Sequence, residues 1–131
     1  MYLVDSGTLK ALINNDLQVL QNFEKWEDQI VMSSIVAMEC YNSAINVKND
    51  KILNFYKTLF NSYKTLSFGN EDGLVFAKIN YELVNIDKAV GEFELMIASQ
   101  CLAQNCTLVS GNPERFESIK NLSVINWISS N

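Results

Sequence analysis

The sequence contains no histidine and few of the residues that interrupt regular structure. Its 131 residues include a single proline and five glycines. Without histidine there is no imidazole to donate a proton, accept one or share in binding a metal ion. The scarcity of proline and glycine favours long helices with short connections. Acid–base or metal chemistry in this chain must therefore depend first on its carboxylates.

Long apolar segments are also missing. No stretch approaches the ~18 consecutive apolar residues of a membrane-spanning helix. The N-terminus lacks a basic region and Asp5 interrupts its apolar run early, so we expect no signal peptide and no membrane association. The 48% hydrophobic and 19% charged content is typical of a globular protein. Without a linker, repeat or low-complexity tract, we expect residues 1–131 to form one domain.

Cysteine usage and net charge indicate the cellular compartment of the protein and the partners that it can bind. Cys40, Cys101 and Cys106 make an odd count without the spacing of a zinc site or a CxxC motif. We expect three reduced, structural cysteines and a cytoplasmic protein. The net charge of −5, with basic residues scattered singly, argues against broad, non-specific nucleic-acid binding. It does not exclude a nucleic-acid enzyme whose metal ions meet the phosphate locally.

Short apolar runs alternate with segments of helical periodicity along the chain. The runs predict strands at 2–4, 30–32, 66–68 (edge-like), 107–109 and 124–127. Helical spacing predicts helices at 9–13, 17–26, 34–47 (capped by Ser33 or Ser34), 50–60 (capped by Asp50), 71–86, 92–104 and 113–119. This alternation is typical of α/β proteins, and we expect a three-layer α/β/α sandwich around a short, mainly parallel central sheet.

Three acids lie where apolar segments begin or end. Asp5 closes the run 1–4, Glu39 lies within the apolar segment 34–41, and Glu94 directly precedes residues 95–98. A carboxylate beside buried surface is costly to desolvate unless a positive charge meets it. If the acids converge, they should hold Mg²⁺ or Mn²⁺, because these ions prefer oxygen ligands. Ligands of parallel sheets bind beyond the carboxyl ends of the strands, where Asp5 and the turn 110–112 are expected.

Each of these positions also has a purely structural interpretation. Asp5 can cap the helix that follows it, and Glu39 can belong to an exposed stripe of its helix with Ile35, Asn42 and Asn46. Negative charge in the first turn of a helix is favourable, which would explain Glu94. Asn112 can cap the short helix that begins at Pro113.

The ordered set of motifs resembles a known family. Residues 2–6 (YLVDS) and 33–39 (SSIVAME) look like the first two acidic motifs of PIN domains, and 90–98 (VGEFELMIA) is similar to the third. Residues 107–112 (TLVSGN), Phe116 and 122–127 (LSVINW) look like the end of the VapC-type toxins. Each motif is short, but the resemblance covers essentially the whole chain in order.

This resemblance implies a metal-dependent endoribonuclease that hydrolyses RNA with Mg²⁺ or Mn²⁺. By motif, Asp5, Glu39 and Glu94 would be the metal-binding acids and Asn112 the fourth, polar catalytic position. Ser6 would be the small hydroxyl residue after the first acid. The resemblance also implies a cognate antitoxin (VapB-like) that blocks the site, and a homodimer. The absence of histidine excludes a ribonuclease of the histidine-pair type.

The chain departs from the family pattern at two positions. Glu94 stands where the third acid is usually aspartate, and Gly7 stands where asparagine is frequent. Mg²⁺ demands near-ideal octahedral geometry, so a carboxylate displaced by one methylene can weaken the site. Glu92 is a conceivable substitute but lies out of register. These departures leave open a catalytically weakened or inactive PIN-like binding domain.

Two further alternatives fit less of the sequence. A phosphate- or nucleotide-binding domain of another kind would share the acid at the end of a strand, but the chain has no GxGxxG or GxxxxGK[ST] loop. An interaction-only helical adaptor would leave the apolar strand-like runs unexplained.

The surfaces that would meet RNA and antitoxin are less defined. The basic residues that could touch phosphate are Lys10, Lys48, Lys88 and Arg115, although a solvated charge explains each equally well. The surface between the second and fourth expected helices, 17–26 and 50–60, is amphipathic and could receive an apolar antitoxin segment.

Overall fold

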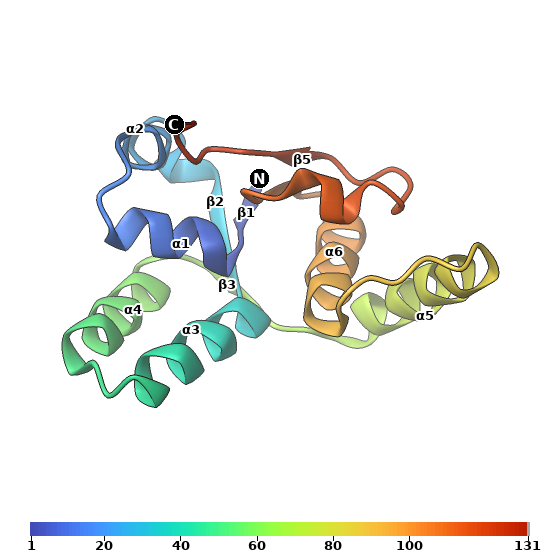
Figure 1. The fold of residues 1–131 in the computed structure, drawn as a ribbon, viewed down its shortest axis with the longest axis horizontal. Helices are drawn as coiled ribbons and strands as arrows, with labels where there is room; N and C mark the ends of the chain where they lie inside the picture. Colours follow the sequence, from blue (N-terminus) through green and yellow to red (C-terminus); the bar gives the residue numbers. More distant parts are fainter. Residues whose placement is uncertain (131) are drawn as a thin grey trace.

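The computed structural model describes residues 1–130, in which short strands and helices alternate as expected (Figure 1). The strands are β1 (Tyr2–Val4), β2 (Ile30–Ser33), β3 (Thr65–Leu66), β4 (Thr107–Val109) and β5 (Val124–Ile125). The α-helices are α1 (Ser6–Ile13), α2 (Leu17–Lys25), α3 (Ser34–Asn46), α4 (Asp50–Ser62), α5 (Asn70–Asn85) and α6 (Glu92–Gln104). Two short 3₁₀ segments, η1 (Glu27–Gln29) and η2 (Pro113–Phe116), complete the set.

The strands form one sheet in the order β3-β2-β1-β4-β5, and every neighbouring pair is parallel. Leu3 of β1 pairs with Val31 on one side and with Leu108 on the other, so β1 is central. The predicted fold class is confirmed, and the sheet is wholly rather than mainly parallel among the described strands. Because all these strands run the same way, their carboxyl ends meet at one edge.

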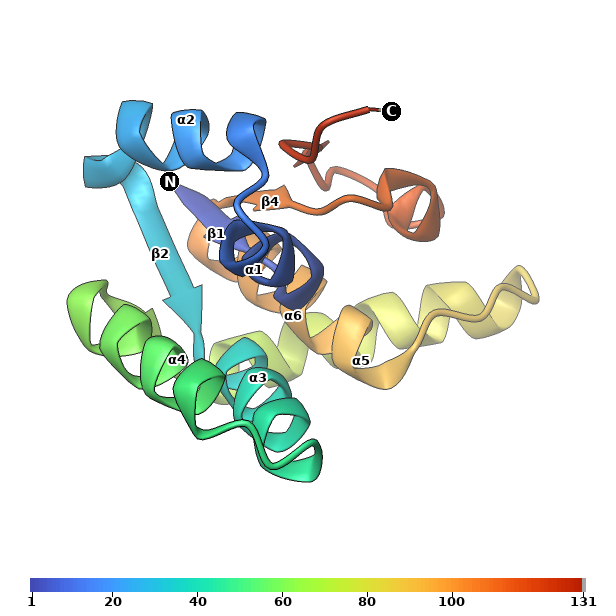
Figure 2. The ribbon, with the colours of Figure 1, turned by 60° about the vertical axis from the view of Figure 1, so that its left-hand side comes forward.

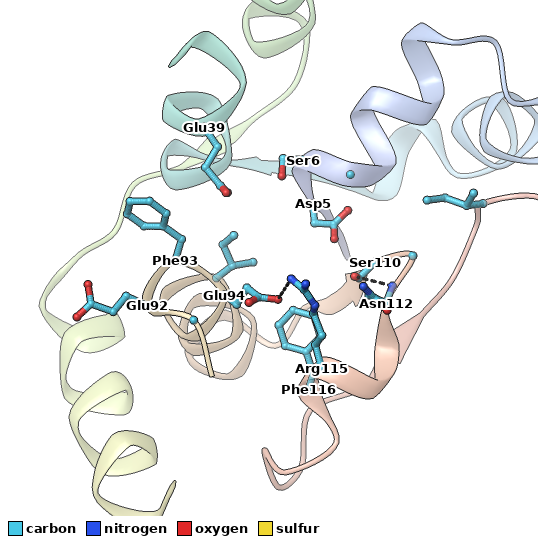
Figure 3. A pocket seen from close by; sticks show the side chains of 15 residues that line it. Asp5, Ser6, Glu39, Glu92, Phe93, Glu94, Ser110, Asn112, Arg115 and Phe116 are labelled. Carbon is cyan, nitrogen blue, oxygen red and sulfur yellow. Dashed lines mark hydrogen bonds and ion pairs between the residues drawn. The ribbon is translucent and has the colours of Figure 1, made fainter. Parts of the chain in front are cut away.

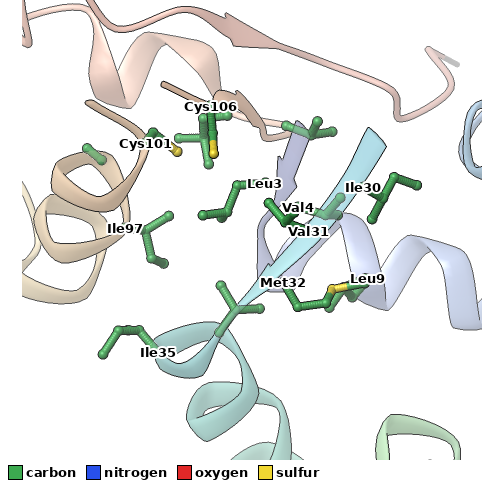
Figure 4. Packing of buried hydrophobic residues seen from close by; sticks show 14 of the residues in the cluster. Leu3, Val4, Leu9, Ile30, Val31, Met32, Ile35, Ile97, Cys101 and Cys106 are labelled. Carbon is green, nitrogen blue, oxygen red and sulfur yellow. The ribbon is translucent and has the colours of Figure 1, made fainter. Parts of the chain in front are cut away.

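Helices cover both faces of this sheet. Figure 4 shows β1 and β2 between α6 on one side and α1 on the other, and Figure 1 shows the same order. Figures 1 and 2 agree that α3 lies beside α4, and α5 packs against α6. The layers bury apolar strand residues on both faces, and Leu3, Val4 and Met32 are fully enclosed. Burial on both faces explains why these strands read as continuous apolar runs.

Side-chain caps fix where the helices begin, and one of them corrects a prediction. Ser33 caps α3 as expected, because its Oγ accepts a hydrogen bond from the backbone N–H of Ile35 at 3.1 Å. The cap of α4 is Asn49, whose Oδ1 accepts from the N–H of Ile52 at 3.0 Å, and Asp50 is the first helical residue. Asparagine and aspartate are equally good caps, so composition alone does not separate adjacent candidates.

Several predicted element boundaries were also wrong, including the start of α1, which is Ser6 rather than residue 9. The edge strand β3 is Thr65–Leu66 rather than 66–68, the segment after Pro113 is a 3₁₀ turn ending at Phe116 rather than a helix to 119, and β5 ends at Ile125 rather than 127. Trp127 leaves the sheet because its ring packs among aromatic side chains, 5.4 Å from the ring centre of Tyr2 and 6.0 Å from that of Phe23. Packing of a large ring therefore overrode strand pairing.

The prediction of three unpaired cysteines is confirmed. Cys40, Cys101 and Cys106 are all buried and free. Burial raises the pKa of the Cys40 thiol to about 12, so this side chain stays neutral. Separately, none of the described helices is both long and apolar enough to cross a membrane.

Asp16 ties the start of α2 to the C-terminal segment. Its Oδ1 accepts from the N–H of Val19 at 3.2 Å and from the Oγ–H of Ser129 at 2.7 Å. The backbone N–H of Ser129 donates to Oδ2 at 3.0 Å. These bonds, the Ser129 hydroxyl first, hold the pKa of the Asp16 carboxyl below its ordinary value.

This contact predicts an acid-dependent loss of stability. Because the pKa of Asp16 is lower in the folded than in the unfolded protein, its charged carboxylate stabilises the fold at pH values above the unfolded pKa of 3.8. This stabilisation is lost as the pH falls through the folded-state pKa. Asp16→Asn keeps the cap but removes the charge, so we expect a flatter dependence of the free energy of unfolding on pH below 4. Urea unfolding of the variant and the unaltered protein below pH 4 measures this dependence. Identical pH profiles would show that the contact with Ser129 does not stabilise the fold.

Candidate active site

Acids from three elements line one cavity at the carboxyl end of the sheet. Asp5 follows β1, Glu39 lies on α3, and Glu94 lies in the first turn of α6. The cavity measures about 530 Å³, and Figure 3 shows the three side chains directed into the same space. Distant parts of the sequence thus bring together the residues that the motifs singled out.

Asp5 has both of the roles considered for it. Its Oδ1 accepts a hydrogen bond from the N–H of Thr8 at 2.8 Å, so Asp5 caps α1. Its backbone N–H donates to the carbonyl of Val109 at 3.0 Å, which ties the end of β1 to β4. Among residues 1–130, no hydrogen-bond donor approaches Oδ2. One oxygen of Asp5 therefore anchors the side chain while the other remains available in the cavity.

Glu39 carries a buried polar atom without a partner. Its Oε1 is shielded from solvent and has no hydrogen-bond partner in the described part of the chain. Burial raises the pKa of this carboxyl, and the charges of Asp5 and Glu94 raise it further. The exposed-stripe interpretation is wrong for Glu39 and for Ile35, which is only 9% exposed. An unpaired buried oxygen is rare in folded proteins and often marks a functional position.

The inward face of α3 does not include Ile45, although this residue is apolar. Its side chain is 59% exposed. The buried positions of α3 include Val36, Cys40 and Ala44, which follow one another at helical spacing. Ile45 lies one residue beyond this stripe, toward the solvent.

Glu94 pairs with a basic residue from the other side of the cavity. Its Oε2 accepts a hydrogen bond from Nη1 of Arg115 at 3.2 Å, and the exposed fractions of the Arg115 and Glu94 side chains are 60% and 29%. Its place in the first turn of α6 also satisfies the helix-dipole interpretation. Of the four basic candidates, Arg115 lines the cavity and Lys10, Lys48 and Lys88 do not.

Asn112 also lines the cavity. It precedes Pro113 at the cap position of η2, but its side chain makes no capping hydrogen bond. The capping interpretation of its amide is therefore wrong, and the amide remains free to act in the cavity (Figure 3). Its backbone N–H donates to Oγ of Ser110 at 3.1 Å.

Other residues of the cavity had no site role assigned from the sequence. Ser110, in the turn 110–112 that the strand-end argument placed near Asp5, directly follows β4, is buried and lines the cavity. Phe93, which is 48% exposed, also lines the cavity. A single aromatic residue between two acids gives no sequence signal for such a position.

The oxygen atoms that line the cavity are chemically suited to bind a hard divalent cation. The cavity offers carboxylate, amide and hydroxyl oxygens, the ligands that Mg²⁺ and Mn²⁺ prefer. The partnerless Oε1 of Glu39 and the mutual repulsion of three carboxylates would both be relieved by a cation. As the side chains stand, no three acids or cysteines within residues 1–130 are grouped closely enough to hold one ion. Glu94 would have to weaken its pairing with Arg115 to contribute.

Removing the guanidinium should therefore strengthen ion binding. An ion pair exposed to this degree contributes ~0.2–1 kcal/mol, so Arg115→Met should raise the affinity for Mn²⁺ by up to about fivefold. Calorimetric titration of the variant and the unaltered protein measures this effect. Lys88→Met removes a positive charge outside the cavity and is the matched control. Weaker Mn²⁺ binding in Arg115→Met would show that Arg115 supports the ion rather than competing with it.

A second cavity lies between α4 and the α1–α2 pair. It measures about 430 Å³, and its apolar lining comprises Leu12, Ile13, Leu20, Ile52 and Phe55. Leu20 and Phe55 are 38% and 41% exposed. The amphipathic surface expected between the second and fourth helices is therefore present as an apolar groove.

Comparison with known proteins places this geometry in context. No protein-family model matches the sequence. Ribonuclease VapC2 of Rickettsia felis is 26% identical over 135 residues, spanning 97% of this chain and 98% of that protein.

Solved structures share the fold over nearly the whole chain. The VapBC2 complex of Rickettsia felis bound to a promoter DNA fragment contains a chain with 25% identity and a TM-score of 0.86, covering 96% of this chain and 98% of that one. DNA-bound VapBC of Salmonella typhimurium has 20% identity and a TM-score of 0.88, and VapBC-1 of nontypeable Haemophilus influenzae has 21% and 0.85. Each of these two covers 96% of this chain and 97% of its counterpart. The resemblance to the VapC-type PIN-domain proteins that the motifs indicated is confirmed, and this protein has their fold from end to end of the sheet.

Proposed function

We propose that this protein is the ribonuclease toxin of a toxin–antitoxin pair and that it hydrolyses RNA phosphodiester bonds with the help of Mg²⁺ or Mn²⁺. Its relative from Rickettsia felis is named a ribonuclease, and the likeness spans both chains almost completely. The observation that carries the metal-dependent part is the buried, partnerless Oε1 of Glu39, which shares a cavity with Asp5 and Glu94. A cation there would supply the missing partner.

In this proposal the three acids hold the ion and the neutral groups orient the RNA. Asp5 contributes Oδ2 while Oδ1 keeps the end of β1 in place, and Glu39 contributes the oxygen that has no other partner. A divalent ion supplies Lewis-acid chemistry, because it makes water a better nucleophile near neutral pH and offsets charge on the phosphate. The Asn112 amide and Ser6 hydroxyl can donate to phosphate oxygens without adding charge. With no histidine, a carboxylate or solvent must accept the proton of the attacking water.

The proposed partner is a cognate antitoxin of the VapB type. Solved structures similar to this chain include VapBC complexes, in which the related chain is found with its partner protein. The apolar groove between α4 and the α1–α2 pair offers exposed Leu20 and Phe55 to an apolar segment of such a partner. A homodimer and a cytoplasmic location complete the proposal.

A cleavage assay with controlled metal content tests this function. We expect the purified protein to cut single-stranded RNA with Mn²⁺ or Mg²⁺ and to be inactive in EDTA, with activity lost when the antitoxin is added. Cleavage that persists unchanged in EDTA would overturn the metal dependence. Tight Mn²⁺ binding without cleavage of any RNA would overturn the ribonuclease.

A second function, that of a catalytically inactive binding domain, is favoured by one observation. Glu94 is engaged by Arg115, and no trio of acids in the described part is tight enough to hold an ion as it stands. In that case the antitoxin would still bind the apolar groove, but Mn²⁺ would not raise the melting temperature. Thermal unfolding with and without Mn²⁺ separates the two functions.

A further inference from the structure

Gln100 of α6 is a polar residue that the protein encloses completely. Its Oε1 accepts a hydrogen bond from the Oγ–H of Ser33, which is also fully buried. Its Nε2 donates to the carbonyl oxygen of Leu66 at 3.2 Å. Burying a side-chain amide is costly even when it is hydrogen-bonded, and an apolar residue would fill the same space without that cost. Packing alone therefore does not explain this glutamine.

The hydrogen bond between Gln100 and Ser33 joins the two helices that carry acids of the site. Ser33 is the cap of α3, and the same Oγ accepts from the N–H of Ile35 at 3.1 Å. Gln100 is thereby attached to the point where β2 ends and α3 begins. Within residues 1–130, no other side-chain hydrogen bond joins α6 to β2 or α3.

The two acids lie at equal distances along their helices from this hydrogen bond. Glu39 follows Ser33 by six residues on α3, and Glu94 precedes Gln100 by six residues on α6. With a rise of 1.5 Å per residue, each acid lies about 9 Å along its helix axis from the bonded pair. Both side chains then line the same cavity (Figure 3). A change in the angle between α3 and α6 at this point would therefore change the separation of the two carboxylates.

This connection acts on the backbones of the helices rather than on the acids themselves. It does not depend on the direction in which either carboxylate points, so Glu94 can turn from Arg115 toward an ion while α6 stays in place. Mg²⁺ tolerates little deviation from octahedral geometry, so its ligands must be brought together precisely. A buried, hydrogen-bonded connection between the helices restricts their relative motion before any ion binds.

We propose that Gln100 is a positioning residue for Glu39 and Glu94, and that it acts through its hydrogen bond to Ser33. The proposal rests on the metal-dependent function proposed above. Gln100 does not line the cavity, so it holds the two helices without touching the ion or the RNA.

Gln104 provides a matched control on the same helix. Its Nε2 donates to Oδ1 of Asp72 at 3.3 Å, which connects α6 to α5 rather than to α3. Methionine is unbranched like glutamine and adapts to irregular space, but it cannot make the hydrogen bonds of the amide. Gln100→Met and Gln104→Met therefore differ in which neighbour of α6 loses its connection.

Two measurements on these variants test the proposal. Calorimetry gives the Mn²⁺ affinity, and electron paramagnetic resonance of the metal-free protein gives the distance between nitroxide labels at the exposed residues Asn46 and Glu92, near the outer ends of α3 and α6. We expect Gln100→Met to weaken Mn²⁺ binding roughly 10–100-fold, as for residues that orient metal ligands, and to broaden the distribution of label distances. Gln104→Met should match the unaltered protein in both.

Cleavage kinetics provide a further readout. A displacement of about 1 Å caused by a change far from the chemistry can cost ~10²-fold in rate, so we expect kcat to fall by this order in Gln100→Met. KM for RNA should not change, because the groups proposed to contact RNA are untouched.

Ser33→Gly breaks the same connection from the other side. Glycine is itself a favoured cap, so the start of α3 loses little by this change. If Gln100 acts through Ser33, the double variant should bind Mn²⁺ no more weakly than Gln100→Met alone. Circular dichroism confirms folding, and if Gln100→Met does not fold, Ser33→Gly makes the same test with the same expected loss of Mn²⁺ affinity.

A role limited to stability predicts a different result. Both glutamine variants would then melt at lower temperatures, while the Mn²⁺ affinity and label distances of the folded proteins stayed unchanged. That outcome overturns the proposal. So do equal losses of Mn²⁺ affinity in Gln100→Met and Gln104→Met, or losses in Ser33→Gly and Gln100→Met that multiply in the double variant.

Failure of this inference and failure of the proposed function are distinguishable. If the unaltered protein neither binds Mn²⁺ nor cleaves RNA, the proposed function fails, and the label distances still show whether Gln100 holds the two helices. If it does both and Gln100→Met behaves identically, the function stands and the assignment of Gln100 alone is wrong.

Discussion

Replacing Asp5 with asparagine should reduce RNA cleavage by at least ~10³-fold, because a divalent ion contributes several kcal/mol to phosphoryl chemistry. Asparagine keeps the shape of the side chain and still caps the helix, so the hydrogen bond from Thr8 at 2.8 Å can be retained. What changes is one negative charge and one oxygen donor in the cavity. Loss of cleavage without loss of stability therefore separates the catalytic role of Asp5 from its capping role.

Single-turnover cleavage and urea unfolding of the same preparation measure these two effects. Asp16→Asn is the matched control, because Asp16 also caps a helix but does not line the cavity. We expect Asp16→Asn to cleave RNA normally at neutral pH. Metal-dependent cleavage retained in Asp5→Asn would refute the assigned role of Asp5.

Glu39→Gln should have opposite effects on stability and activity. Burial, with the charges of Asp5 and Glu94, raises the pKa of Glu39 above its ordinary value, so its charged form opposes folding. That opposition is complete above the raised folded pKa and is relieved as the pH falls through it toward the unfolded value. Neutral glutamine removes it, and the metal-free variant should melt at a higher temperature than the unaltered protein at pH 7.

The same substitution should abolish the stabilisation that an ion provides. A ligand at about 100 times its dissociation constant stabilises the native state by ~2.7 kcal/mol, and Glu39→Gln should lose most of this along with roughly 10²–10³-fold in cleavage. Calorimetric melting with and without Mn²⁺ measures both the stability of the metal-free protein and the stabilisation by the ion. Glu92→Gln is the control, because Glu92 is exposed and its carboxylate points away from the other acids (Figure 3). A lower melting temperature for metal-free Glu39→Gln would contradict this account of the site.

Most of the fold could be predicted from the hydropathy pattern of the sequence. Strands buried on both faces, such as Tyr2–Val4, read as unbroken apolar runs, and the parallel sheet follows from their alternation with helices. The errors lie at element ends, where adjacent residues have nearly equal preferences. Asn49 displaced Asp50 as a cap, and Trp127 left the last strand for an aromatic cluster. Such choices depend on tertiary packing rather than on local propensity.

The residues of the site were identifiable from the sequence, but their contacts were not. Asp5, Glu39, Glu94 and Asn112 line one cavity as their motifs indicated, and their roles toward an ion remain a prediction. The ion pair between Glu94 and Arg115 joins residues 21 positions apart from different elements. This contact has no one-dimensional pattern from which it could be predicted.

Diffraction at the manganese absorption edge, from crystals soaked in Mn²⁺, tests the central claim most directly. We expect an anomalous peak enclosed by the carboxylates of Asp5 and Glu39, with Glu94 turned toward it from Arg115. An empty cavity at a Mn²⁺ concentration that supports RNA cleavage, or a peak bound elsewhere on the protein, would contradict it.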